Sequence, residues 1–93
     1  MDITERVTEL VRIPSVNPLH AGPVSGDGAE RELSDWLANH TEALGADVVV
    51  DAVEGDRCNV YARFEGSSDR AVTIDVHLDT VGVEHMTDDP FDG

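Results

Sequence analysis

Two residues at the end of a predicted β-strand could do chemistry. His77 and Asp79 stand two positions apart in the run VHLDTV of residues 76–81. Residues at this spacing on an extended chain point to the same side, so an imidazole and a carboxylate would project together. Neutral imidazole is the commonest biological ligand of zinc, and a carboxylate that accepts its other ring hydrogen fixes the tautomer. The pair suggests a metal ligand with its orienting partner, although the spacing also fits an ordinary hydrogen bond at a strand end.

The strand expected to carry this pair covers residues 70–76, where apolar side chains alternate. Two other strands are expected before it. Residues 46–53 contain three consecutive valines, so both faces are apolar, and we expect this strand near the middle of a sheet with cover on both sides. Residues 57–64 alternate, and the short turn before them predicts an antiparallel hairpin. The better buried face of this second strand should carry Cys58, Val60, Ala62 and Phe64.

A first amphipathic helix is expected over residues 2–13, whose apolar side chains recur at helical spacing. Asp2 and Glu5 can form a capping box at its start. Pro14 ends it, because proline lacks an amide hydrogen and disfavours helical geometry in the residue before it.

A second helix is expected over residues 27–44, with a stronger helical repeat of apolar side chains. Asp27 is placed to cap its start and Gly45 to cap its end. Residues 14–28 separate the two helices and are rich in proline, glycine and serine, which is the composition of an irregular surface loop.

The predicted order of elements is helix, helix, hairpin and third strand, which places the chain among α/β layered folds. With 93 residues, the chain is expected to form one domain and no second one. It carries 20 acidic against 6 basic side chains and a formal net charge of −14. Such a polyanion is repelled by nucleic acid and by anionic membranes, and the charge also raises the hypothesis of adaptation to high salt.

Cys58 is the only cysteine, so no disulfide can form within the chain, and a reducing compartment fits best. Charged residues interrupt the first fifteen positions, which leaves no apolar core for a signal peptide. No stretch approaches the roughly 18 apolar residues of a membrane span. These features predict a cytoplasmic protein.

Four segments, taken in order, resemble a known family. They are residues 10–18 (LVRIPSVNP), the helix with its end at 30–45, residues 57–60 (RCNV), and residues 77–81 (HLDTV) followed by 89–93 (DPFDG). Together they are similar to the metallopeptidase family of aminoacylase, acetylornithine deacetylase, succinyl-diaminopimelate desuccinylase and glutamate carboxypeptidase. The resemblance implies a three-layer α/β/α zinc-peptidase-like catalytic domain, of which this chain would be a truncated amino-terminal fragment.

The resemblance makes His77 a zinc ligand and Asp79 the catalytic-site carboxylate that orients it. In complete enzymes of the family, two zinc ions polarise the amide of an N-acyl amino acid or small peptide and activate a bridging water. The other ligands and the glutamate base have no counterpart here, so the chain alone is expected to bind metal weakly and to hydrolyse nothing. Gly82 departs from the family, which usually has proline there.

Other candidate residues have plainer interpretations. His40 lies on the apolar side of the second helix and fits a packed histidine better than a ligand. His20 and His85 fall in predicted loops and should be exposed. Cys58 should be a small core residue and not a reactive thiol.

Two functions from different classes remain open. One is a fragment of a zinc-dependent amidohydrolase or exopeptidase. The other is a non-catalytic small α/β protein, or a remnant, that associates through its open sheet edge. An uncovered valine face would favour self-association, and the negative charge would oppose it.

Overall fold

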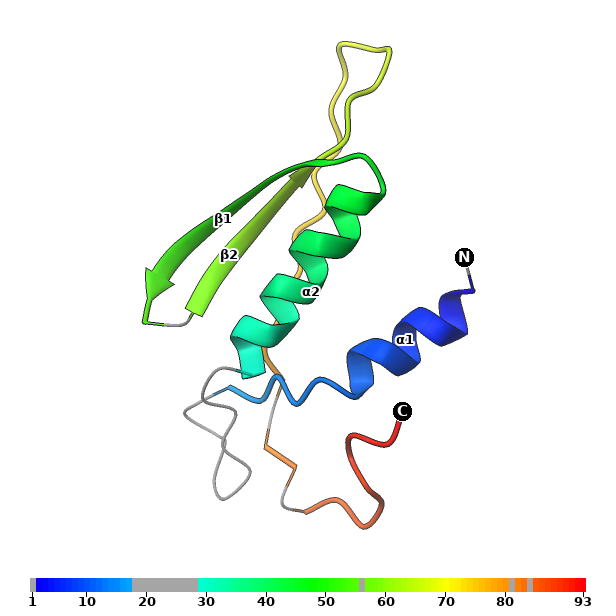
Figure 1. Cartoon of the computed structure of the whole chain (residues 1–93), viewed down its shortest axis with the longest axis vertical. Coiled ribbons are helices and arrows are strands. Elements are labelled where there is room, and N and C mark those ends of the chain that lie inside the picture. The colour runs from blue at the N-terminus through cyan, green and yellow to red at the C-terminus, as the bar shows by residue number, and fades with distance from the viewer. Residues whose placement is uncertain (1, 18–28, 56, 81, 84) are drawn as a thin grey trace.

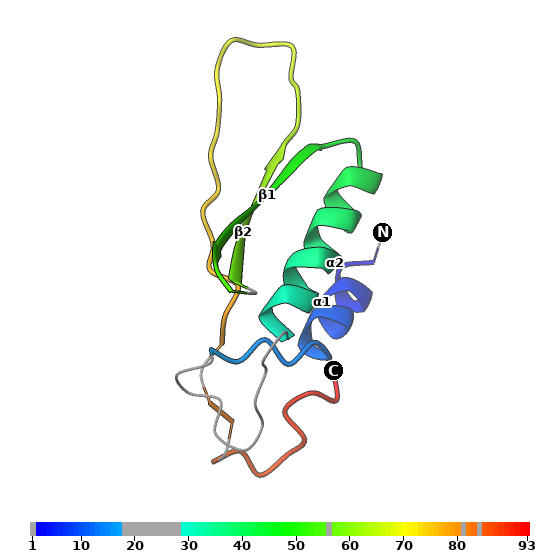
Figure 2. The same cartoon turned by 60° about the vertical axis from the view of Figure 1, so that its left-hand side comes forward.

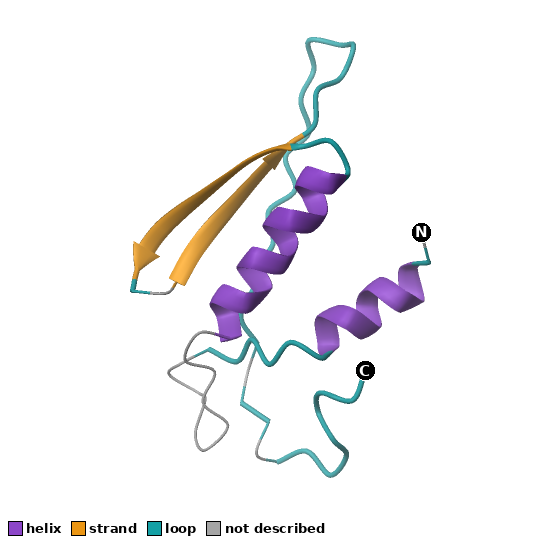
Figure 3. Cartoon of the chain, in the orientation of Figure 1, coloured by secondary structure: helices purple, strands orange, loops and turns teal. Residues whose placement is uncertain are grey.

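The computed structural model of the chain describes residues 2–17, 29–55, 57–80, 82–83 and 85–93. Within these residues it contains two helices and one antiparallel sheet of two strands, so the chain is of mixed α/β character (Figures 1 and 3). The elements are α1 (Ile3–Val11), α2 (Ala29–Ala43), β1 (Asp47–Glu54) and β2 (Arg57–Arg63). In the described part of the chain, neither helix has the length and apolar character needed to cross a bilayer.

Helix α1 begins where the sequence predicts. The Asp2 carboxylate caps it, but it accepts its 2.8 Å hydrogen bond from the Thr4 N–H and not from that of Glu5. No residue of α1 is buried, and Ile3, Val7 and Val11 stay exposed. The apolar stripe therefore forms as expected but is only partly covered.

Helix α2 is the longer element, and its described start and its end agree with the prediction within two residues. The expected cap, Asp27, lies outside the described residues. At the other end the Gly45 N–H donates to the Glu42 carbonyl and the Ala46 N–H to the Thr41 carbonyl. This is the double hydrogen bond of a Schellman motif, and it requires the positive φ of 102° that Gly45 adopts.

The predicted hairpin is confirmed. Strands β1 and β2 pair antiparallel, with Val50 opposite Val60 and Ala52 opposite Cys58. Directly opposed residues share a face of a sheet, so these four point to one side. Cys58 is buried on that side, where the guanidinium of Arg31 in α2 donates to its sulfur at 3.3 Å. Helix α2 therefore covers this face.

The expectation that β1 is covered on both faces is wrong for the described residues. Val49 and Val53 point away from α2 and are 60% and 64% exposed. Among the described strands, β1 pairs only with β2. The consecutive valines predict that both faces of β1 are covered. In the described residues only one face is covered, by α2.

The predicted third strand over residues 70–76 is also wrong. This segment is extended but belongs to no ladder, and Val72 and Ile74 are 90% and 83% exposed. It returns past the hairpin on the side of β2, yellow to orange in Figures 1 and 2. Residues 73–79 and β2 line the same cavity of about 690 Å³, so the two segments face each other across it without a ladder.

A small core lies where residues 13–17 cross the later part of the chain. Ile13, Val16 and Leu33 are buried, and Val16 is fully enclosed. Val16 forms an isolated parallel bridge with Thr80. The Asn17 N–H donates to the Thr80 carbonyl at 2.8 Å, and the Thr80 N–H donates to the Ser15 carbonyl at 2.9 Å. This bridge fixes the chain directly after the candidate pair.

The end of α2 gives a test of the backbone argument. A Cβ added at Gly45 would meet no atom within 4 Å, so Gly45→Ala should act only through its positive φ. We expect it to lower the free energy of unfolding by about 1–2 kcal/mol. Gly66→Ala is the matched control, because Gly66 is equally open and has no positive φ. Urea unfolding followed by circular dichroism measures both, and an equal loss in the two variants would contradict the assignment.

Candidate functional site

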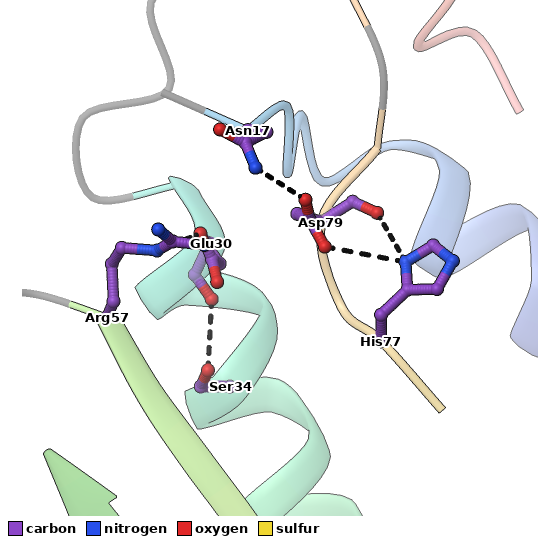
Figure 4. Close-up of polar contacts among 6 residues, drawn as sticks. All are labelled: Asn17, Glu30, Ser34, Arg57, His77 and Asp79. Atoms are coloured by element: carbon purple, nitrogen blue, oxygen red, sulfur yellow. Dashed lines mark hydrogen bonds and ion pairs between the residues drawn. The ribbon is translucent and has the colours of Figure 1, made fainter. Parts of the chain in front are cut away.

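The candidate pair lies on the extended segment just before the bridge to Thr80 (Figure 4). The His77 side chain is 85% exposed, and the Asp79 side chain is 29% exposed. Both residues also line the cavity of about 690 Å³ beside β2. The structure thus brings together the two residues that the sequence singles out, although the strand expected to hold them is absent.

The imidazole of His77 contacts Asp79 through two different oxygens. Its Nδ1 lies 2.8 Å from the Asp79 backbone carbonyl oxygen and 3.4 Å from the carboxylate Oδ1. A carbonyl oxygen can only accept, so Nδ1 carries the hydrogen in the neutral ring. The sequence suggests the carboxylate as the orienting partner, but the closer partner is the main chain of the same residue. In this tautomer Nε2 keeps the lone pair that a metal would take.

The Asp79 carboxylate has a second partner that lies far away in sequence. The side-chain amide of Asn17 donates to Asp79 Oδ2 at 2.7 Å, across 62 residues (Figure 4). One carboxylate oxygen therefore faces the loop at residues 13–17, and the other faces His77. Asn17 is absent from the predicted site residues. The only sequence feature that could have pointed to Asn17 is its place in residues 10–18, one of the segments that resemble the metallopeptidases.

The hydrogen bond from Asn17 is the main reason why the pKa of the Asp79 carboxyl is lowered. A donor that points at the charged form stabilises it. The nearby His77 and Arg57 favour the carboxylate as well, while partial burial opposes it. Arg57 is itself held by Glu30 of α2, with 3.2 Å between Nε and Oε2. Asp79 is therefore an ionised acceptor at neutral pH.

The other described histidines have different surroundings and do not join this pair. His40 stacks on Trp36 within α2, with ring centroids 4.7 Å apart, which agrees with a packed histidine. His85 is exposed in a turn, and His20 lies outside the described residues. No three His, Cys, Asp or Glu side chains of the described ranges come close enough to hold a metal ion. At the candidate site, the described residues therefore supply one imidazole, that of His77. They do not form a complete zinc site, which takes about four ligands.

A second cavity, of about 630 Å³, lies on the other side of His77. Its walls come from α1, α2 and the segment 82–91, and they are mostly apolar, including Leu10, Leu37 and Phe91. His77 lines both cavities. Val76, Leu78 and Leu37 line both cavities as well, so the segment that carries the imidazole borders the cavity beside β2 and the more apolar cavity next to α1.

The lowered pKa of Asp79 predicts a pH-dependent stability. The stabilisation from a carboxyl whose pKa falls on folding is present above its unfolded-state pKa of about 3.9 and is lost as the pH drops through the lower folded-state value. Asn17→Ala removes the main cause of the shift. The wild type should therefore be more stable than this variant at neutral pH, and the gap should close in acid.

Urea unfolding at pH 7, 5, 4, 3 and 2 measures this gap. Asn39→Ala is a matched control, since Asn39 is exposed on α2. A gap between wild type and Asn17→Ala that stays constant with pH would contradict the assigned cause.

Comparison of the chain with protein families, with curated proteins and with solved structures found no match in any of the three.

Proposed function

We propose that this chain is the amino-terminal segment of a zinc-dependent hydrolase that cleaves an amide bond of an N-acyl amino acid or small peptide. His77 is the proposed zinc ligand, and Asp79 is the carboxylate beside it. The observation that carries the proposal is the orientation of the His77 ring, whose Nδ1 lies against Asp79 and whose Nε2 is left as the metal-binding atom. A ring fixed through one nitrogen is the usual arrangement of a metal-binding histidine.

This chain by itself is not expected to hydrolyse a substrate. The described residues supply one imidazole where a catalytic zinc takes about three protein ligands and an open position. The chain's own contribution would be to present His77 Nε2 at the wall of the cavity beside β2. The Asp79 carboxylate lies 3.4 Å from the ring, where it would orient a metal-bound imidazole.

The uncovered surfaces of the hairpin support the idea of a larger domain. Val49, Val53 and Tyr61 are exposed apolar side chains of the hairpin, and they alternate with polar residues such as Asp51 and Asn59. The segment 71–79 lies beside β2 without a ladder. Faces and edges of this kind are covered in finished α/β domains. We therefore propose the three-layer α/β/α arrangement as the complete fold. We also propose a cytoplasmic location, which the single cysteine supports because it suits a reducing compartment.

A second candidate function rests on the same exposed surfaces. A small α/β protein could associate with a second copy through the open edge of β1, which pairs only with β2 among the described strands and carries exposed valines. Val49 and Val53 favour this candidate, while the net charge of −14 opposes it at low salt. The two candidates are separated by the experiments that follow.

Zinc binding tests the first candidate. We expect zinc to shift the NMR signals of the His77 ring in the wild-type chain, weakly and reversibly with a chelator. In zinc titration calorimetry, which does not depend on the ring signals, His77→Ala should raise the dissociation constant at least about tenfold, because it removes the ligand itself. His85→Ala is the matched control, since His85 is also exposed. Zinc binding that survives His77→Ala would contradict the assigned ligand.

Self-association tests the second candidate. The Debye length falls from about 10 Å at 0.1 M salt to about 3 Å at 1 M, so charge repulsion between copies fades. If the exposed valines of β1 contribute to association, the sedimentation coefficient should rise with salt, and Val49→Thr should reduce the rise. Val7→Thr is the control, because Val7 is a half-exposed valine on α1. A chain that stays monomeric at 1 M salt would contradict this candidate.

A further inference from the structure

We propose that Asn17 is a positioning residue for the candidate metal ligand, because its side-chain amide holds the Asp79 carboxylate in a fixed orientation beside His77. The inference rests on the proposed function and deepens it, since it assigns a role within the same site. The sequence pattern at residues 77–81 does not predict this role, because the residue that donates to the Asp79 carboxylate lies 62 positions earlier in the chain.

The two oxygens of the Asp79 carboxylate have different partners. Oδ2 accepts from Asn17 Nδ2 at 2.7 Å, and Oδ1 lies 3.4 Å from His77 Nδ1. A carboxylate held by one short hydrogen bond cannot rotate freely, so the second oxygen stays turned toward the ring. The bond from Asn17 thereby decides where the negative charge next to the imidazole lies.

Asn17 is the firmly held end of this contact. Its own N–H donates to the Thr80 carbonyl, and the Thr80 N–H donates to the Ser15 carbonyl. The neighbouring Ser15 and Val16 are both buried. The segment that carries His77 and Asp79 is extended and belongs to no ladder before Thr80. The bridge therefore ties the pair to the loop, and the buried Ser15 and Val16 anchor the loop side of the contact.

The contact needs an amide at position 17. Only the nitrogen of the Asn17 side chain can donate to a carboxylate, and an aspartate there would bring two negative charges to the same 2.7 Å contact. The chain already has a net charge of −14, which would add to that repulsion. Asn17→Asp is therefore nearly isosteric with the wild type but should release the Asp79 carboxylate.

Two features of the His77 ring are controlled separately in this arrangement. The Asp79 main-chain carbonyl fixes which ring nitrogen carries the hydrogen, because it lies 2.8 Å from Nδ1. The Asn17 side chain fixes the carboxylate that stabilises the ring when a metal withdraws charge from it. Loss of Asn17 should leave the tautomer unchanged and weaken the metal affinity.

The test measures the position of the Asp79 side chain directly, by the three-bond NMR couplings that report its χ1 angle. We expect one rotamer in the wild type and averaging over several in Asn17→Ala and Asn17→Asp. The matched control, Asn39→Ala, should keep the single rotamer, since Asn39 is exposed on α2. Zinc titration of the His77 signals should show about 3- to 10-fold weaker binding in Asn17→Ala, somewhat less than the loss for a direct partner of a ligand.

Further readouts separate positioning from mere folding. The ¹⁵N shifts of the His77 ring should show the same tautomer in all four proteins, and hydrogen exchange at the Thr80 amide should stay protected in both Asn17 variants. A single Asp79 rotamer in both variants would overturn the inference, as would loss of Thr80 protection, which would make Asn17 a structural residue of the loop. If zinc does not bind His77 even in the wild type, the proposed function fails, while the rotamer measurement still decides the role of Asn17.

Discussion

The parallel bridge between Val16 and Thr80 is the contact on which the arrangement of this chain depends. It joins the loop after α1 to the end of the extended segment by two short backbone hydrogen bonds. Val16 is fully enclosed there, so the hydrogen bonds are shielded from competition by water. Without this crossing, the segment that carries His77 would have no regular backbone partner, because it belongs to no ladder before Thr80.

The Asp79 carboxylate has a defined partner, although the molecule as a whole is strongly acidic. Asp79 stays ionised to a lower pH than an ordinary aspartate, because the hydrogen bond from Asn17 lowers its pKa and the nearby His77 and Arg57 act in the same direction. Most other acidic side chains are exposed and repel one another through water. What distinguishes Asp79 is a neutral donor held in place by a buried loop. Its role is set by that neighbour and not by net charge.

Local signals in the sequence were sufficient to predict the helices and the hairpin. The cap at Asp2, the glycine at position 45 and the alternation after Arg57 all act within a few residues, and the structure agrees with them in element type and pairing. The expected buried face of β2 is confirmed at Cys58 but not at Ala62 and Phe64, which are exposed. The strand at 70–76 could not be predicted correctly, because a strand exists only with a hydrogen-bonded partner, and alternation says nothing about the partner. The two-residue spacing brought His77 and Asp79 together, but the contact of Asn17 with Asp79 depends on tertiary structure.

The long separation between Asn17 and Asp79 also has a kinetic meaning. Closing a loop costs entropy that grows with the logarithm of its length, and contacts between distant residues slow the folding of small proteins. Helix α2 and the hairpin can form from neighbouring residues during synthesis. The imidazole and its carboxylate acquire their geometry only after Thr80 has left the ribosome and closed the loop. A shorter nascent chain would contain every secondary element of the described structure and still have no assembled site.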